Sequence, residues 1–552
     1  MLREQILKLL SEGFAQEIKH DDHQLLAEVS PERLQALTEL LLKRFNARLS
    51  FITASDEGVK GFQVVYIFSF GHVERGVYLV AKVSAPRFNG RVPSLASTTR
   101  QAIWAERETM EFTGITFTGN PDPRHLWLPY TWPEYDYRKV RIGAEESLHA
   151  GRDLRARVIP IGPYHPATLE GQYVKLFMEG DVIVDADIKL GFNHRGVNRL
   201  IERRSFDRGV FAAERVCGIC SGAHGLAYVT AVERLCDVKP PERALHIRTL
   251  LAELNRIQSH LLWLGVLCDI TGFKTGFMLS WSLRERILDI ISLITKYRVH
   301  YNIWRLGGVS RDIPDDLAGK IVRQLSKLKE QASSLAKKIA EHPLIKHRLM
   351  EVGILKFHDA VDIGAVGPTA RGSGWKIDVR VDHPPNAAYA DHGIQWEIPV
   401  YTGQDCYARL LVRIDEILES INICQQILNK LPQLPKDLLT EVGNPTEGSE
   451  AVGFNEAPRG ELLYYVKAGE EGAPACVRVR TPSYRNNACL PAMLKGYTLA
   501  DAPVIMASID QCMACTDRVE IVDVKKQSSF ALSWHELLAF SRKASRRFSI
   551  NA

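Results

Sequence analysis

The 552-residue chain is 45% hydrophobic and 24% charged, with a formal net charge of +5, a balance that excludes a disordered or fibrous protein. A single core rarely serves so long a chain, so two or three domains are expected. The sequence has no block of like charges, no run of 18 apolar residues and no signal-peptide core at its start. We therefore expect no nucleic-acid partner, and a cytoplasmic protein that only partner subunits hold at a membrane.

The first part of the chain has the pattern of a small α+β domain. The first 14 residues form an amphipathic helical pattern, and β-rich runs follow at 62–70 and 76–84. A helix is expected over about 97–112. A polar, proline-containing stretch comes next and has the composition of a tail that leads into a linker.

Helical periodicity dominates the second part of the chain. Helices are predicted at 241–269, 282–299, 315–342 and 406–431. Strand patterns at 461–468 and 475–481 flank a turn sequence and predict a hairpin. The predicted fold class is α+β, a small N-terminal α+β domain followed by a mainly helical domain. We expect the N-terminal domain at 1–140, a linker at 141–157, the helical domain at 158–518 and a C-terminal extension at 519–552.

Four of the ten cysteines form two CxxC pairs, Cys217 with Cys220 and Cys512 with Cys515. Four thiolates suit zinc, an iron-sulfur cluster, or nickel with iron. Structural zinc sites usually gather both pairs within a few tens of residues, so the wide separation here disfavours zinc. The other six cysteines are scattered singly, and we expect no iron-sulfur cluster within this chain.

The residues around the two pairs are more specific than the pairs alone. RVCGICSGAH at 215–224, DQCMACTDR at 510–518 and EAPRG at 456–460 together resemble the large subunits of nickel-iron hydrogenases. The resemblance extends over about 160–552, with the motifs in the family's order. It implies a cofactor of nickel and of iron that carries CO and CN ligands. It also implies that Cys217 and Cys512 are terminal ligands of nickel, while Cys220 and Cys515 bridge nickel to iron.

The same resemblance assigns roles to residues outside the cysteine pairs. It implies that Glu170 accepts protons beside a terminal sulfur. Arg459, which follows Pro458 in a turn, would donate hydrogen bonds to iron-bound cyanide with help from Ser483. The remaining two assignments are Asp510, which would orient Arg459, and His224, which would hydrogen-bond at the site or toward a partner's cluster. Taken singly, these residues also allow plainer readings: an exposed carboxylate, a surface ion pair, a turn serine and a structural histidine.

The N-terminal domain narrows the resemblance to one branch of the family. VPS at 92–94, WAERE at 104–108 and GITFTGNP at 114–121 resemble the 30-kDa subunit of respiratory complex I. Its fusion to a hydrogenase large subunit resembles the group 4 enzymes, such as formate hydrogenlyase and hydrogenase-4. That implies hydrogen evolution on the cytoplasmic face of the inner membrane. Expected partners are a small subunit with a 4Fe-4S cluster, complex I-like membrane subunits, and a donor module of formate dehydrogenase, CO dehydrogenase or ferredoxin.

Three features qualify this picture. The 49-kDa subunit of complex I shares the fold, and GPYHPA at 162–167 resembles it, so a quinone-reducing or scaffold subunit that uses His165 is the alternative. In the family a tail like 519–552 is removed after nickel insertion, which implies a maturation protease and nickel-insertion factors. Gln511 and Asn198 depart from the family's usual Pro and Glu. The second departure puts a magnesium site in doubt, since that ion prefers carboxylate oxygens.

Overall fold

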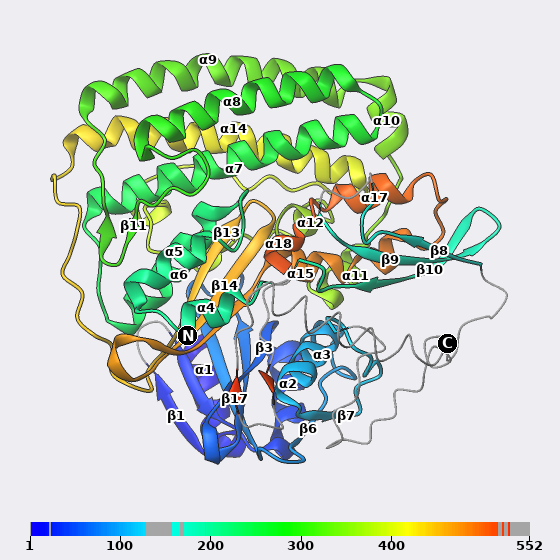
Figure 1. Cartoon of the computed structure of the whole chain (residues 1–552), viewed down its shortest axis with the longest axis vertical. Helices are drawn as coiled ribbons and strands as arrows, with labels where there is room; N and C mark the ends of the chain where they lie inside the picture. The colour runs from blue at the N-terminus through cyan, green and yellow to red at the C-terminus, as the bar shows by residue number, and fades with distance from the viewer. Residues whose placement is uncertain are drawn as a thin grey trace, which may run out of the picture.

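The computed structural model describes residues 2–20, 24–128, 157–165, 170–193 and 195–516, with the pairs 522–523 and 528–529. Figure 1 shows a smaller part built from the N-terminal elements and a larger part with long helices. Most of the predicted linker at 141–157 and of the predicted extension at 519–552 lies outside the described residues. The expected domain boundaries therefore stay predictions.

The N-terminal part is built on a five-stranded sheet of order β1-β2-β5-β4-β3, in which β2 and β5 run parallel and the other neighbours antiparallel. The predicted strands are confirmed as β4 and β5, and the predicted helices as α1 and α3, with α3 starting four residues late. The elements are α1 (Leu2–Leu9), η1 (Leu10–Phe14), β1 (Glu17–His20), β2 (Leu25–Glu28), α2 (Pro31–Phe45), β3 (Arg48–Asp56), η2 (Gly58–Lys60), β4 (Phe62–Ser69), β5 (Tyr78–Ala85), β6 (Arg91–Pro93), α3 (Gln101–Thr113) and β7 (Thr116–Thr118).

The strands β3, β4 and β5 are buried on both faces, which explains why the sequence of β4 is almost continuously apolar. Side chains alternate between the two faces of a strand. Val64 and Tyr66 belong to the core under the helices, whereas Val65 and Ile67 pack with residues of a second sheet such as Phe454. The second sheet has the order β13-β14-β15 and comes from the C-terminal part of the chain. The two parts of the molecule are thus joined by sheet-on-sheet packing.

Four long helices, α7, α8, α9 and α14, lie alongside one another in the larger part (Figure 1). The predicted helix at 315–342 is confirmed as α9, whose apolar stripe is buried at Ile321, Leu325 and Ile339. The predicted helix at 282–299 is α8, but it begins eight residues earlier. Gly276 permits this early start, because a Cβ there would lie 2.6 Å from the Phe273 ring. Their bounds are α7 (Glu242–Ile270), α8 (Lys274–Thr295), α9 (Asp315–Ala340) and α14 (Cys406–Lys430).

Shorter elements surround these helices. The predicted hairpin is confirmed as β14 and β15, while β13 was not predicted. The strands are β8 (Arg157–Ile161), β9 (Tyr173–Glu179), β10 (Val182–Lys189), β11 (Trp304–Arg305), β12 (Gly308–Val309), β13 (Glu450–Ala457), β14 (Gly460–Ala468), β15 (Pro474–Arg480), β16 (Val522–Asp523) and β17 (Ser528–Ser529). The helices are α4 (Val197–Glu202), α5 (Phe206–Glu214), α6 (Ser221–Leu235), α10 (Pro343–Leu349), α11 (Phe357–Ile363), α12 (Gly367–Arg371), α13 (Val379–Asp382), η4 (Ala390–His392), η5 (Leu431–Gln433), η6 (Glu470–Gly472), α15 (Pro482–Asn487), α16 (Leu490–Leu494), α17 (Ala502–Ser508) and α18 (Met513–Thr516).

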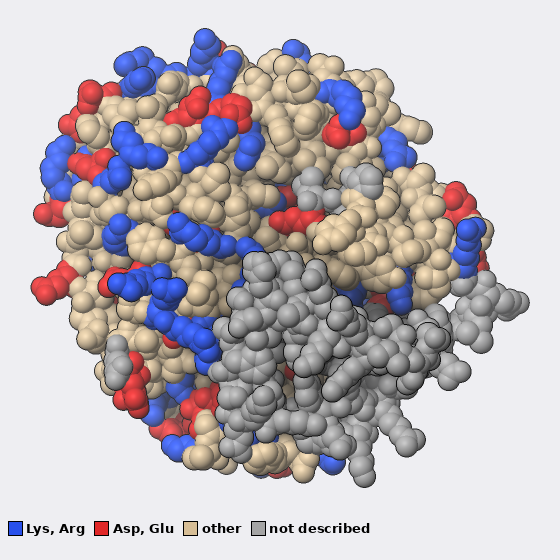
Figure 2. Space-filling model, in the orientation of Figure 1, with Lys and Arg blue, Asp and Glu red and all other residues tan. Residues whose placement is uncertain are grey.

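The described surface carries both signs of charge. In the view of Figure 2, Lys and Arg side chains are interspersed with Asp and Glu over the helical part. Among the described residues, no helix combines the length and the apolar character needed to cross a membrane.

Candidate metal centre

The two CxxC pairs, far apart in the sequence, meet in the interior. The sulfur of Cys217 lies 3.5 Å from that of Cys512, and the sulfur of Cys220 lies 3.3 Å from that of Cys515. All four side chains are at most 2% exposed. The structure therefore brings together the four predicted ligands as one cluster of sulfur donors.

The first pair lies in the turn between α5 and α6, and this turn holds it locally. The sulfur of Cys217 accepts hydrogen bonds from the backbone N–H groups of Ile219 at 3.2 Å and Cys220 at 3.3 Å. Cys220 precedes α6 directly, so its backbone is continuous with a buried helix. The turn itself therefore orients Cys217, and Asn255 and Gln258 of α7 also donate to its Ile219 carbonyl.

The second pair is held mainly by residues from distant segments. The N–H of Cys512 donates to the Ser483 hydroxyl at 3.0 Å. One carboxylate oxygen of Glu170 accepts from the backbone N–H groups of Met513 and, at 2.8 Å, Ala514. Ser483 therefore lies at the site, where its oxygen accepts the N–H of Cys512, and its predicted help to Arg459 in binding cyanide stays a prediction.

Arg195 connects the two cysteine loops and was given no role by the sequence patterns. Its guanidinium donates to the carbonyls of Val216 at 2.6 Å and Ala514 at 2.7 Å. These residues directly precede Cys217 and Cys515. An exposed arginine beside a glycine carries no sequence signal that would separate this contact from ordinary surface polarity.

Glu170 lies beside the second pair. Its other carboxylate oxygen is 4.0 Å from the sulfur of Cys512. Burial raises the pKa of this carboxyl, and negative charge on the Cys217 sulfur raises it further. The fully exposed reading of Glu170 is wrong, while its role in proton transfer stays a prediction.

Arg459 and Pro458 form the two-residue turn between β13 and β14, as the sequence suggested. The guanidinium of Arg459 donates to the Asp510 carboxylate at 2.7 Å, to the Asp510 carbonyl at 2.5 Å and to the Ser259 hydroxyl at 3.2 Å. Both members of the ion pair are 1% exposed, so the surface-pair reading is wrong. Burial raises the pKa of Asp510 to about 6.

The β13–β14 turn rests directly on the backbone of α12. A Cβ at Gly460 would lie 2.5 Å from the nitrogen of Gly367, and one at Gly367 would lie 2.4 Å from the Cα of Gly460. Both residues also have positive φ, 122° and 62° respectively. Only glycine satisfies both conditions at these two positions.

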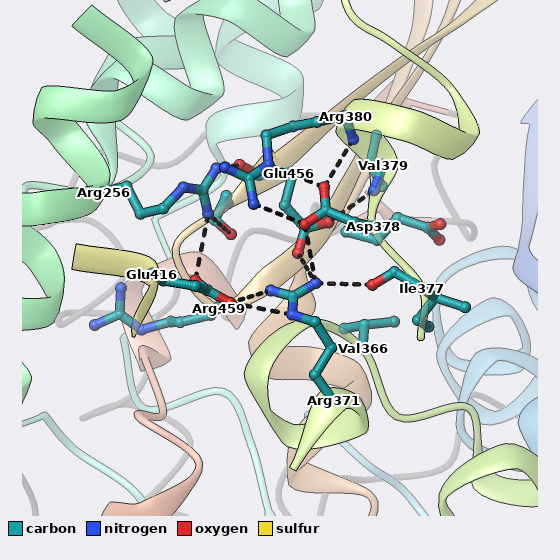
Figure 3. A network of polar contacts seen from close by, with 12 residues as sticks. Arg256, Val366, Arg371, Ile377, Asp378, Val379, Arg380, Glu416, Glu456 and Arg459 are labelled. Carbon is teal, nitrogen blue, oxygen red and sulfur yellow. Dashed lines mark hydrogen bonds and ion pairs between the residues drawn. The ribbon is translucent and has the colours of Figure 1, made fainter. Parts of the chain in front are cut away.

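A buried network of charged side chains supports the strand that leads to Arg459 (Figure 3). Arg371 donates to Glu416 at 2.6 Å and to the Glu456 carboxylate at 2.9 Å. Arg256 of α7 donates to the Glu456 carbonyl at 2.7 Å. Burial raises the pKa of Glu456 to about 7, and nearby negative charge on Asp378 contributes. Both α7 and α12 therefore fix the end of β13.

His224 contacts the cluster from α6. One imidazole nitrogen lies 2.8 Å from the Tyr464 hydroxyl and the other lies 3.4 Å from the sulfur of Cys515. The side chain is 1% exposed. The structure thus places His224 against a predicted bridging ligand, which fits the first of its two predicted contacts.

The four sulfurs have the character of a metal-binding set. Hydrogen bonds from the Cys220, Cys512 and Cys515 thiols lower the pKa of Cys217 well below its usual range. Hydrogen bonding to Cys217 in turn raises the pKa values of Cys220 and Cys512, with burial and the negative charge on Cys217 contributing, and burial together with Cys217 raises that of Cys515. One negative charge therefore opposes further ionisation. A cation would remove this opposition, and thiolates select soft metal ions such as nickel and iron.

Comparisons with protein families cover most of the chain. Residues 27–145 match the respiratory-chain NADH dehydrogenase 30 Kd subunit, and residues 270–447 and 436–518 match the 49 Kd subunit. Residues 195–270 match the nickel-dependent hydrogenase family. This last segment contains the first CxxC pair and the whole of α7.

Three curated relatives align over long stretches. Formate hydrogenlyase subunit 5 of Escherichia coli is 34% identical, over 94% of this chain and 93% of that protein. Membrane-bound hydrogenase subunit alpha of Pyrococcus furiosus is 38% identical, over 71% of this chain and 94% of that protein. A component of the NADH-quinone oxidoreductase of Aquifex aeolicus is 31% identical, over 86% of this chain and 88% of that protein.

One solved structure is similar over most of its own length. It is that of the membrane-bound sulfane sulfur reductase, an archaeal respiratory membrane complex. The TM-score is 0.61 at 29% sequence identity, and the match covers 66% of this chain and 98% of that chain.

Proposed function

Because the chain belongs to the family of membrane-bound hydrogenase large subunits that includes formate hydrogenlyase subunit 5, we propose that it is the catalytic subunit of a hydrogen-evolving, formate hydrogenlyase-like complex. It is an oxidoreductase that acts on hydrogen, within a complex I-like assembly. The observation that carries the proposal is the meeting of the two CxxC pairs, with sulfurs 3.3 and 3.5 Å apart.

The residues of the site fit a nickel-iron centre in which the first and the second cysteine of each CxxC pair take different positions. Cys217 and Cys512 would be terminal ligands of nickel, and Cys220 and Cys515 would bridge nickel to iron. When bound, this centre supplies the two-electron chemistry that interconverts protons and H₂. The four thiolates provide the electron-rich donors that such a centre needs.

Glu170 would move the proton. Its carboxylate oxygen is 4.0 Å from the Cys512 sulfur, close enough for transfer after a small rotation of the side chain. Its raised pKa brings the carboxyl closer to neutral pH, where a group can both accept and release a proton. The two N–H groups that bind its second oxygen would keep the carboxylate oriented.

Arg459 would bind the diatomic ligands of the iron. A guanidinium has five N–H donors, and the contacts to Asp510 and Ser259 occupy three of them, so 5 − 3 = 2 remain. Those two donors suit cyanide, which is a strong hydrogen-bond acceptor. Asp510, Ser259 and the β13–β14 turn would keep the guanidinium in place, as outer residues do at many metal sites.

The electrons would come from other subunits. We expect a small subunit with a 4Fe-4S cluster, complex I-like membrane subunits, and a donor module based on formate dehydrogenase, CO dehydrogenase or ferredoxin. The assembly would lie on the cytoplasmic face of the inner membrane. Nickel-insertion factors would load the site, and a maturation protease would cut after Arg518. A full-length intact mass for active enzyme would contradict the cleavage.

The decisive experiment is the infrared spectrum of the intact complex purified from its native host. Stretches of iron-bound CO and CN are expected, together with about one nickel per chain, since neither a zinc site nor a quinone pocket produces these bands. A matured complex without bands or nickel would contradict the proposal.

A matured complex that lacks both these bands and nickel would support a second candidate function, that of a quinone-reducing or scaffold subunit. This candidate is favoured by the Aquifex aeolicus relative from an NADH-quinone oxidoreductase, which matches most of the chain. His165, which it would use, is exposed after β8. The candidate gives no role to four buried sulfurs in contact, so nickel content separates the two functions directly.

A further inference from the structure

A second group of potential metal ligands lies at the start of α7, away from the middle of the helix, which contacts the surroundings of the sulfur cluster. Glu242 and His246 come from the first turns of α7, and His392 comes from η4. One ligand atom from each lies within 4.8 Å of the others. No family match or catalytic role accounts for this group.

His246 is already oriented as metal-binding histidines usually are. Its Nδ1 lies 2.9 Å from the Glu242 carbonyl, a contact that holds the proton on Nδ1 and leaves a lone pair on Nε2. The side chain is 1% exposed, and its Nε2 has no hydrogen-bond partner among the described residues. A buried, unpaired acceptor of this kind costs free energy unless a ligand satisfies it.

The other two side chains complete the group and connect it to solvent. His392 Nδ1 lies 3.6 Å from a carboxylate oxygen of Glu242. Both residues line a cavity of about 790 Å³ between the two parts of the molecule. Lys430 donates to the His392 carbonyl at 2.6 Å, and its positive charge opposes a bound cation. The Glu242 carboxylate offsets that charge.

We propose that Glu242, His246 and His392 bind a zinc ion. Two imidazole nitrogens and one carboxylate oxygen form a ligand set typical of zinc, and a water molecule from the cavity would complete a tetrahedron. Donors of a tetrahedral zinc ion lie about 3.3 Å apart, so the Glu242–His392 pair needs little movement and no pair needs to approach by more than about 1.5 Å. His392 and the partly exposed Glu242 are on or near the surface and can make this movement.

The site differs from the sulfur cluster in chemistry and position. Its donors are nitrogen and oxygen. Along α7, His246 and Ser259 are separated by roughly 20 Å, at 1.5 Å rise per residue. The zinc would fasten η4 to the start of the helix that carries Arg256 and Ser259 to the catalytic site, and would have no part in hydrogen chemistry.

The first test measures zinc and nickel together in the complete complex, by mass spectrometry of the metals after desalting. Wild type is expected to hold about one zinc per chain. His246→Asn keeps an amide near the Nδ1 position and removes Nε2, and it should lose that zinc without loss of nickel. His347→Asn, an exposed histidine on α10, is the matched control. Equal zinc in all three proteins would overturn the proposal.

The second test needs no variant, so it remains decisive if His246→Asn fails to fold. Wild-type complex depleted of zinc with a mild chelator is titrated with Co²⁺ alone. The expected signature is the visible absorption of tetrahedral cobalt without a thiolate-to-cobalt charge-transfer band, which zinc then displaces. A spectrum with the thiolate band, or no stoichiometric binding, would overturn the proposal.

Discussion

The two cysteine pairs have the same CxxC spacing but are held in place by different kinds of contact, one mainly local and the other mainly from distant segments. The first pair is held largely by its own turn, where the Cys217 sulfur accepts the N–H groups of Ile219 and Cys220. The second pair depends more on remote residues, namely Glu170 and Ser483, while Arg195 contacts both cysteine loops. A short motif can therefore specify one half of a site, while the other half requires the completed fold.

This difference has an energetic origin. The first pair forms with the contacts of adjacent helices, whose loop-closure cost is small. Bringing the second pair to it closes a loop of 295 residues, and this ordering must be stabilised by contacts made on arrival. We therefore expect substitutions among the remote residues to affect the second pair selectively.

The largest effect should come from the ligands themselves, where the two pairs should behave alike. Cys217→Ser and Cys512→Ser each remove one thiolate, and each should lower nickel content and hydrogen production by more than about 100-fold, since loss of an outer partner alone costs 10- to 100-fold. Metal analysis and hydrogen detection on the purified complex test this. Wild-type nickel in either variant would refute the ligand assignment.

The substitution Glu170→Gln should show whether Glu170 transfers protons or mainly holds the second cysteine pair in place. Glutamine still accepts the N–H groups of Met513 and Ala514, but it cannot carry the proton. Hydrogen production should fall by about 10²- to 10⁴-fold, the usual contribution of general acid-base catalysis. Nickel content should stay within about twofold of wild type. If nickel falls with activity, Glu170 serves mainly to hold the second pair.

Two serines give a matched comparison of the pairs. Ser483→Ala leaves the buried N–H of Cys512 without its acceptor, which costs about 1–3 kcal/mol and should weaken nickel retention by about tenfold. Ser221→Ala beside the first pair removes a hydroxyl that donates to the Val299 carbonyl. It should change retention by less than about twofold, because the turn still holds Cys217 and Cys220. Equal losses during chelator challenge would contradict the comparison.

Arg195→Gln should have the smallest effect. The guanidinium bridges the carbonyls of Val216 and Ala514, but water competes for an exposed donor. A decrease of up to about fivefold in nickel retention is expected, with little change in turnover per nickel. Arg199→Gln, on the neighbouring α4, is the control. A loss of turnover at full nickel content would show a catalytic role instead.

Much of the fold was predictable because the spacing and type of apolar residues in the sequence indicate which positions are buried. The helix α9 was predicted from the helical spacing of its apolar residues, and β4 and β5 from their β-rich composition. β13 was not, because its residues from Glu450 to Ala457 are buried on both faces and include polar side chains that bond within the network. The early start of α8 was hidden by Gly276, whose effect depends on Phe273 packing against it.

At the site, motifs predicted the cysteines, Arg459 and Glu170, whereas the residues that hold them escaped prediction. Arg195, Ser259 and Arg256 act through backbone carbonyls or a single hydroxyl, and such contacts leave no pattern in the sequence. The sequence patterns also gave no sign that the Ser483 hydroxyl accepts the N–H of Cys512. The direction in which a side chain points is set by packing, and the spacing of residues along the sequence does not reveal it.

Because Gly367 and Gly460 are in direct contact, the distance between the β13–β14 turn and α12 is set by the two backbones alone. No side chain lies between the two segments, so no change of side-chain volume in the surrounding core can act there as a spacer. Core residues can vary between apolar types of similar size while Arg459 keeps its position. Substitutions in the hydrophobic core around the centre therefore leave this spacing unchanged, because it depends on two residues that have no side chain.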